Sequence, residues 1–348
     1  MLALLLILAA QSGPDRSYAL VDDLEPAARY SAERGGLALL VWKGDRTVLE
    51  RYDNGAKAQD RNNAFSITKA VWGLATAAAV EDGLLSWDER VSSTLTEWRE
   101  DPVRRTIDLR QLLSMTSGLD PGYTVIDDPN TADKLSAATG LQAIAEPGFT
   151  FNYGPGNMAA LGELLRRKLK PKGLTPMRFL SARILTPLGL SGLPWSTDKA
   201  GNPMMAAGSV MSARELLAVG HAYLDGRSLS GKRVIKTSSL GPLTIPSSAN
   251  GMFGLTLWLN RGAFEEDAVE VDVEQALGLT GFAGWKTGCF SRSAPADVLV
   301  LLGSYNQRVY VVPSLDLVVV RQGKTMELKD AEFMRLLFEE RPAELVMY

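Results

Sequence analysis

A serine and a lysine stand three positions apart at the start of an alanine-rich segment. Ser66 and Lys69 belong to the stretch FSITKAVWGLATAAAVEDG, residues 65–83, which has the composition of a buried helix ended by Gly83. Residues three apart lie on one face of a helix. A serine hydroxyl becomes a nucleophile when a base takes its proton, and a neutral lysine amine can be that base. The pattern therefore indicates covalent catalysis by Ser66 with Lys69 as its base.

The same helix explains how a lysine amine could be neutral. The positive end of a helix dipole and burial among apolar residues both disfavour an ammonium, so both lower the pKa of a lysine there. Backbone amides at the helix start also suit an oxyanion. The alternative is a chance Ser-x-x-Lys in which Ser66 only caps the helix and Lys69 is a solvated residue. The apolar sequence that follows favours the catalytic interpretation.

Composition excludes several other chemistries. The 348 residues are 46% hydrophobic and 22% charged, as in a globular protein of about two domains. One cysteine, Cys289, and one histidine, His221, provide no cluster of soft or imidazole ligands, so we expect no metal and no cofactor. The net charge of −3 provides no field that would recruit nucleic acid.

Antiparallel strand pairs are predicted near both ends of the chain. Residues 37–52 and 309–321 each contain two β-rich runs around a turn. Helical spacing is found over residues 24–33 and over DAEFMRLLFEER, residues 330–341. The middle of the chain, about 90–205, is rich in helical pieces broken by Pro-Gly turns.

This order of elements predicts an α/β (α+β) fold. We expect an antiparallel sheet flanked by helices and built from both chain ends, with a helical lobe inserted between them. The predicted domains are residues 18–90 together with 206–348, and the lobe 91–205. A site in the cleft between the two is the default expectation.

The N-terminus has the features of an export signal. Leu2 to Ala10 is a run of nine apolar residues, too short to span a bilayer and typical of a signal-peptide core. We therefore expect residues 1–17 to be a signal segment and the protein to be exported to the periplasm or beyond the cell. No Lys or Arg precedes the run, which leaves a buried N-terminal segment in a cytoplasmic protein as the alternative. No later run is long and apolar enough for a stable membrane span.

Four segments, taken in order, resemble the serine β-lactamase and penicillin-binding-protein superfamily, on its class C-like and esterase side. The first is the Ser-x-x-Lys element at Ser66 and Lys69. The others are similar to the turn after the nucleophile helix, to the Tyr-x-Asn segment and to the strands beside the site, and they are residues 106–120, 146–165 and 303–323. The resemblance covers roughly residues 36–323 and implies a β-lactamase/transpeptidase-like fold.

The resemblance implies a role for each candidate catalytic residue. Ser66 is the acylated nucleophile, Lys69 its base, and Tyr153 the phenol that passes a proton to the leaving group and helps to activate water. A tyrosine suits that role because its hydroxyl both donates and accepts, and a neighbouring ammonium lowers its pKa. The alternative is that Tyr153 is only a core aromatic.

The oxyanion site is also placed by analogy. Its donors are expected to be the backbone amides of Ser66 and Ser304. Gly303 and Tyr305, which flank Ser304, are further candidates for substrate binding in this part of the chain.

Two departures from the family pattern concern the substrate. Pro155 stands where many relatives have the Asn of Tyr-x-Asn, and Asn157 is a candidate to replace it. The motif that is commonly Lys-Thr-Gly or His-x-Gly is best matched by Leu301, Leu302 and Gly303, without a cation for a substrate carboxylate. Both changes argue against penicillins and D-Ala-D-Ala peptides and favour a neutral ester or amide.

A literal Lys-Thr-Gly occurs elsewhere, at Lys286, Thr287 and Gly288. It lies about twenty residues before the strand that starts at Val309, whereas in the family the motif is much closer to that strand. We interpret it as part of a loop. If it is a working motif, β-lactamase or peptidase activity becomes credible again.

Other patterns have simpler explanations. His221 lies on a helical pattern and is interpreted as a locally bonded helix residue. The Gly-x-Gly-x-x-Ala match at residues 154–159 is interpreted as a turn into a helix, and the basic run at residues 166–172 as a solvated helix end. Trp258 and Trp285 could line an acyl pocket, but core packing is the simpler expectation.

The sequence thus predicts a serine hydrolase that forms an acyl-enzyme with a small ester or amide. One alternative is a catalytically silent receptor of the same fold that binds penicillin or cell-wall fragments. Another is a true β-lactamase or D-Ala-D-Ala carboxypeptidase. The expected partner is a small molecule, with no nucleic acid and no metal. The sequence does not indicate an oligomeric state.

Overall fold

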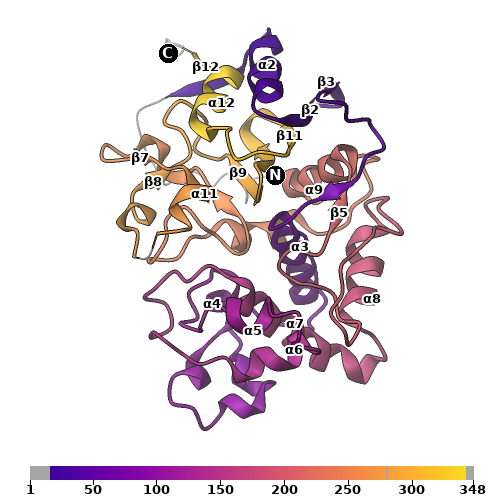
Figure 1. The fold of residues 1–348 in the computed structure, drawn as a ribbon, viewed down its shortest axis with the longest axis vertical. Helices are drawn as coiled ribbons and strands as arrows, with labels where there is room; N and C mark the ends of the chain where they lie inside the picture. The colour runs from indigo at the N-terminus through magenta and orange to yellow at the C-terminus, as the bar shows by residue number, and fades with distance from the viewer. Residues whose placement is uncertain (1–15, 280, 342–348) are drawn as a thin grey trace, which may run out of the picture.

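The structure is a computed structural model that describes residues 16–279 and 281–341. Within these residues the centre is a six-stranded antiparallel sheet in the order β3-β2-β11-β10-β9-β6 (Figure 1). Its strands are β2 (Gly36–Lys43), β3 (Arg46–Tyr52), β6 (Trp258–Leu259), β9 (Leu299–Gly303), β10 (Gln307–Val312) and β11 (Leu317–Gly323). The predicted α/β (α+β) fold, with an antiparallel sheet built from both ends of the chain, is confirmed.

Helices cover both faces of this sheet. They are α2 (Glu25–Glu33) and α12 (Asp330–Leu337) on one face, and α9 (Ala213–Asp225) and α3 (Ile67–Glu81) on the other. Along β10 the side chains alternate between the two layers. Tyr310 packs on Phe333 of α12 with ring centroids 5.9 Å apart, whereas Val309 faces Gly220 of α9. A strand covered on both faces is predominantly apolar, which explains the valine-rich runs within β10 and β11.

Helices and turns make up the region between these strands. The α-helices there are α4 (Leu109–Leu113), α5 (Tyr123–Ile126), α6 (Lys134–Ala137), α7 (Pro155–Leu169) and α8 (Pro176–Leu180). Figure 1 shows them gathered below the sheet, with α3 between them and the sheet. The two short strands β4 (Asn62–Asn63) and β5 (Val210–Met211) pair where the chain leaves the sheet region and returns to it. The domain boundaries 91 and 205 stay a prediction.

The ends of the described chain pair with each other. β1 (Ser17–Leu20) runs antiparallel to β12 (Phe338–Arg341). The predicted helix over residues 330–341 is therefore wrong beyond Leu337, where α12 ends. Backbone pairing with a strand more than 300 positions away decides this segment, and helical periodicity carries no information about such a partner. Residues 1–15 of the predicted signal segment lie outside the described residues, and Ser17 begins β1.

The remaining elements lie beyond β5 in the chain. They are α10 (Thr237–Leu240), α11 (Val273–Ala276), and the parallel pair β7 (Val269–Glu270) and β8 (Gly288–Cys289). No helix among the described residues is long and apolar enough to cross a membrane.

Candidate active site

Ser66 lies at the N-terminal end of α3, directly after a strained residue. Phe65 has a φ of 48°, a left-handed conformation that costs a non-glycine residue about 1–2 kcal/mol. This turn delivers Ser66 to the start of the helix, but its side chain makes no capping hydrogen bond. Its Oγ instead lies 2.7 Å from the Nζ of Lys69. The alternative in which Ser66 merely caps the helix is therefore wrong.

Lys69 is a buried amine that forms no ion pair with a carboxylate in the described part of the chain. Its residue is 3% exposed, and its Nζ hydrogen-bonds to Ser66 Oγ and, at 3.1 Å, to the carbonyl oxygen of Ala206. Burial lowers the pKa of Lys69 to about 7, against the opposing charge of Asp127. The second half of the chance alternative, a solvated Lys69, is also wrong. Near neutral pH this amine exists in both protonation states, as a general base requires.

Tyr153 faces Lys69 across the site. The Lys69 Nζ lies 4.7 Å from the centroid of the Tyr153 ring, and the ring packs on Phe253 and Trp258 at centroid distances of 6.0 and 5.9 Å. Burial raises the pKa of Tyr153 to about 12, although its hydrogen bond with Ser66 acts in the opposite direction. The expectation that a neighbouring ammonium lowers this pKa is wrong, because burial is the largest influence and the opposing one is the hydrogen bond with Ser66, not the charge of Lys69. The phenol is a proton donor at neutral pH.

These three side chains meet in one pocket of about 280 Å³. The pocket lies at the end of α3, between the sheet region and the helical region. Its lining residues are Ser66, Lys69, Tyr123, Asp127, Tyr153, Gly154, Pro155, Ala206, Ala207, Glu274, Leu277, Leu302, Ser304 and Met326. The predicted nucleophile, base, phenol and Ser304 are thus brought together from three separate parts of the chain.

The end of β9 closes one side of the pocket. A Cβ atom on Gly303 would lie 2.3 Å from the carbonyl oxygen of Ala64, so only a glycine lets β9 approach the turn before Ser66. Ser304 and Leu302 line the pocket. Tyr305 does not line it; its ring packs on Phe65 at a centroid distance of 5.3 Å. Leu302 thus presents an apolar side chain at the position that the resemblance gives to the family's third motif.

Asn157 is not brought to the pocket. It is buried in the first turn of α7, where its Oδ1 accepts a hydrogen bond from Ser117 Oγ at 2.5 Å. The helix begins at Pro155, which does line the pocket. Asn157, two residues further along the helix, faces the segment that carries Ser117. The structure thus gives Asn157 no place in the pocket lining, and its replacement of the family's amide stays a prediction.

The literal Lys-Thr-Gly lies outside this site. Lys286 is exposed in the turn before β8, and neither it nor Thr287 or Gly288 lines the pocket. β8 pairs with β7 and is not part of the six-stranded sheet. The arrangement agrees with the interpretation of these residues as part of a loop.

The other candidates of the sequence also occupy structural positions. His221 packs edge-on against Trp42 and hydrogen-bonds through Nδ1 to the carbonyl of Arg227. Trp258 and Trp285 belong to the aromatic cluster behind Tyr153 and do not line the pocket. Burial raises the pKa of the Cys289 thiol to about 12, so this thiol is not a reactive thiolate at neutral pH.

Two pocket carboxylates were missed at the sequence level. Glu274 is on α11, and Asp127 directly follows α5. Asp127 lies a few residues after the segment that resembles the family turn, which could have drawn attention to it. No local signal marks Glu274, because its position depends on a contact with Arg308 of β10.

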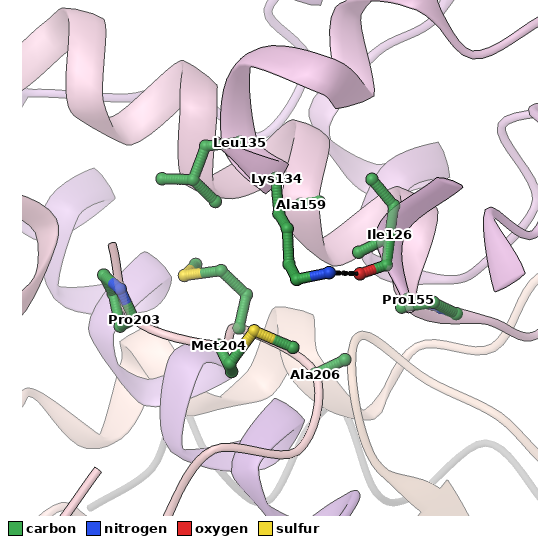
Figure 2. A pocket seen from close by; sticks show the side chains of 9 residues that line it. Ile126, Lys134, Leu135, Pro155, Ala159, Pro203, Met204 and Ala206 are labelled. Atoms are coloured by element: carbon green, nitrogen blue, oxygen red, sulfur yellow. Dashed lines mark hydrogen bonds between the residues drawn. The ribbon is translucent and has the colours of Figure 1, made fainter. Parts of the chain in front are cut away.

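A much smaller cavity of about 10 Å³ lies beside the pocket and shares Pro155 and Ala206 with it. Figure 2 shows that the Lys134 side chain reaches across this space to the carbonyl of Ile126. Lys134 Nζ also donates to the carbonyl of Asp128 at 2.7 Å. A space of this size holds about one water at most. Lys134 thus fixes the end of α5 beside the pocket, and this cavity is not a substrate site.

No group of three or more His, Cys, Asp or Glu side chains that could hold a metal ion occurs among the described residues.

Comparison with known proteins places the chain in a family. The Beta-lactamase family model matches residues 21–326. The chain is 29% identical to lovastatin esterase from Penicillium rubens over 174 residues. This aligned segment makes up 42% of this chain and 43% of the esterase. The chain thus matches less than half the length of that curated relative.

Two solved structures are similar in fold. A penicillin-binding-protein homologue from Caulobacter crescentus has a TM-score of 0.66 at 17% identity, over 92% of this chain and 98% of that one. A D-stereospecific amidohydrolase from Streptomyces sp. has a TM-score of 0.61 at 17% identity, over 90% and 97% of the two chains.

Proposed function

Because the chain belongs to the β-lactamase family, we propose that it is a serine hydrolase that acts on a small ester or amide through an acyl-enzyme at Ser66. The observation that carries this proposal is the 2.7 Å contact between Ser66 Oγ and Lys69 Nζ. The amine in that contact is buried, and burial lowers its pKa to about 7. A hydroxyl paired with such an amine is an activated nucleophile.

Acylation begins with Ser66. Its Oγ attacks the carbonyl carbon of the substrate while the neutral amine of Lys69 takes the hydroxyl proton. The charge that develops on the carbonyl oxygen is stabilised by the N–H groups of Ser66 and Ser304, neither of which donates to another group among the described residues. Backbone donors that are fixed in advance stabilise such an oxyanion effectively.

Tyr153 completes acylation as the proton donor. The phenol, protonated at neutral pH because its pKa is about 12, gives its proton to the leaving oxygen or nitrogen as the bond to carbon breaks. The ammonium of Lys69 then returns a proton to the phenolate. In deacylation a water takes the place of the leaving group, and the same two groups remove and return the proton. Two groups with pKa values far apart can divide the roles of acid and base in this way.

The pocket favours an uncharged reacting group. Pro155 lines it where many relatives have an amide, and Leu302, which also lines it, belongs to the segment Leu301-Leu302-Gly303 that lacks the cation of the family's third motif. A substrate carboxylate therefore has no cationic partner from that segment. The names of the similar proteins support the reaction class, since lovastatin esterase is named for an ester and the Streptomyces protein for amide hydrolysis.

The first experiment mixes stoichiometric protein with p-nitrophenyl butyrate and compares the wild type with Ser66→Ala. We expect a burst of nitrophenol followed by steady turnover, both absent from the variant. One equivalent released and then none would favour the silent receptor. Hydrolysis of nitrocefin at a higher kcat/KM than the ester would favour a β-lactamase. Equal release by both proteins would overturn the role of Ser66.

A further inference from the structure

Glu274 places a buried carboxylate in the wall of the pocket. Its side chain is 7% exposed, and it comes from the single turn of α11. It lines the same pocket as Ser66 and Tyr153, and its charge is close enough to raise the pKa of the Tyr153 phenol. The proton-transfer steps above do not use this residue.

The two oxygens of this carboxylate are unequally bonded. Oε2 accepts from Arg308 Nη2 at 2.8 Å and from Asn306, whose Nδ2 and backbone N lie at 2.5 and 3.2 Å. Oε1 is buried and has no hydrogen-bond partner among the described residues. An unpartnered carboxylate oxygen out of water is costly, and a donor that reaches it forms a strong, charge-assisted bond. The donors from the fold thus all bond Oε2, and Oε1, on a residue that lines the pocket, has none within the described part of the chain.

The charges of the lining point to the class of that donor. Two carboxylates, Asp127 and Glu274, line the pocket, and the only lysine or arginine among the lining residues is Lys69. Lys69 is the proposed base of the reaction, and burial lowers its pKa to about 7. Leu302, which lines the wall, adds an apolar side chain and no positive charge. The lining therefore has two carboxylates and a single cationic side chain.

We infer that the substrates of this pocket carry a primary ammonium group and that Glu274 Oε1 receives it. The inference rests on the proposed function and adds to it the class of substrate, an ester or amide of an amine-bearing molecule. The reacting carbonyl is uncharged, as proposed above, and the ammonium is a second, separate point of recognition. Glu274 is a specificity-determining residue here, not a group that transfers the reaction's protons.

The test measures binding, so it does not depend on turnover. Dissociation constants of hexylammonium, hexanamide and hexanoate are measured by NMR titration at pH 7.5, because these ligands have similar length and differ in charge. We expect hexylammonium to bind the wild type at least about tenfold more tightly than hexanamide, as a charge-assisted hydrogen bond allows. Hexanoate should bind most weakly.

Variants identify the residue responsible. Glu274→Gln should reduce the preference for hexylammonium over hexanamide to within about twofold, and Glu274→Asp should retain part of it. Asp330→Asn is the matched control, because Asp330 bonds the same Arg308 without lining the pocket. Glu266→Gln removes an exposed carboxylate as a second control. Both controls should keep the wild-type preference.

The outcomes separate this inference from the proposed function. Equal binding of hexylammonium and hexanamide to the wild type overturns the inference, even if Glu274→Gln does not fold. A preference that persists in folded Glu274→Gln also overturns it. If p-nitrophenyl butyrate is turned over through Ser66 but the ammonium has no advantage, the inference alone fails. If the ammonium is preferred but no Ser66-dependent hydrolysis occurs, the proposed function fails and Glu274 remains a cation site.

Discussion

Two of the buried cations, Lys69 and Arg308, are treated in opposite ways by the fold. Lys69 is 3% exposed and Arg308 is not exposed at all. Among the described residues Lys69 hydrogen-bonds to a hydroxyl and a carbonyl and to no carboxylate, so burial lowers its pKa to about 7. Arg308 pairs with two carboxylates, Glu274 and Asp330, each at 2.8 Å, and these charges raise its pKa despite burial. Burial without a charged partner lowers the pKa of a cationic side chain. Pairing with a carboxylate stabilises the charged form and raises that pKa.

The chemistry of lysine and arginine explains why the unpaired cation is Lys69 and the paired one Arg308. A lysine shifts its pKa readily and becomes a base, whereas a guanidinium stays charged and bonds carboxylates in a fixed geometry. Lys69 is thus available for proton transfer at the price of stability. Arg308 instead fixes β10, α11 and α12 to one another, because it bonds Glu274 on α11 and Asp330 on α12.

The largest expected effect comes from replacing the unpaired cation. Lys69→Met removes the base and should lower kcat/KM for p-nitrophenyl butyrate by about 10²- to 10⁴-fold. The variant should also be more stable, by about 1–2 kcal/mol at pH 7, because a buried group that resists charging is gone. Activity assays and urea unfolding check both effects, and a less stable variant would contradict the contrast with Arg308.

The same variant tests how the free energy of unfolding depends on pH. The pKa of Lys69 is about 7 in the folded protein, against an ordinary value of 10.5. Between those values the unfolded chain holds the extra proton, so the free energy of unfolding of the wild type rises with pH. The stability gap between Lys69→Met and the wild type should therefore shrink as the pH is raised from 7 to 10.

Replacing the paired cation should have the opposite effect on stability. Arg308→Met leaves Glu274 and Asp330 buried without their partner, so the free energy of unfolding should fall by about 3–5 kcal/mol. Arg335→Met, which removes an exposed arginine paired with Glu270, is the control and should change it by less than about 1 kcal/mol. Equal losses in the two variants in chemical denaturation would show that burial of the pair is irrelevant.

The phenol beside Lys69 is expected to matter for rate and not for stability. Tyr153→Phe keeps the ring that packs on Phe253 and Trp258 but removes the proton donor. We expect kcat to fall by about 10²-fold with a melting temperature within about 2 °C of the wild type. A variant with full activity would assign proton donation to another group.

The pH dependence follows from the two pKa values. With Lys69 as the base, kcat/KM should fall about tenfold per pH unit below pH 7 and level off above it, since the amine must be neutral. Because the pKa of Tyr153 is about 12, no second loss should occur up to pH 10. A profile measured with p-nitrophenyl butyrate in overlapping buffers checks this, and a midpoint near 10 would mean that Lys69 is not the base.

The smallest effect is expected at an exposed lysine. Lys286 lies outside the pocket, so Lys286→Ala should leave ester hydrolysis, and any hydrolysis of nitrocefin, within about twofold of the wild type, as for a surface substitution. Loss of nitrocefin hydrolysis alone would revive the literal Lys-Thr-Gly as a working motif.

Local patterns were sufficient for much of the fold. Apolar runs around turns identified β2, β3, β10 and β11, and the apolar helix that starts after Ser66 is α3. The segment FEER, residues 338–341, was misassigned because its strand pairs with residues 17–20 at the other end of the chain. Periodicity records what a segment does by itself and contains nothing about a distant partner.

The site divides in the same way. The spacing of Ser66 and Lys69 placed both on one helical face, and their 2.7 Å contact follows from that. Asn157 bonds Ser117 and does not line the pocket with Pro155, because two positions along a helix change the face on which a side chain lies. Glu274 was missed because only the packing of α11 against β10 brings it to the pocket.

The sequence by itself therefore determined which groups could react: a serine and a lysine at helical spacing, a tyrosine in a recognisable segment, and a third motif without its cation. The tertiary structure decided what state those groups are in. It buries Lys69 without a carboxylate, keeps Tyr153 protonated, and leaves one oxygen of Glu274 without a donor. Protonation and pairing depend on burial and on neighbours from distant segments, and these exist only once the chain has folded.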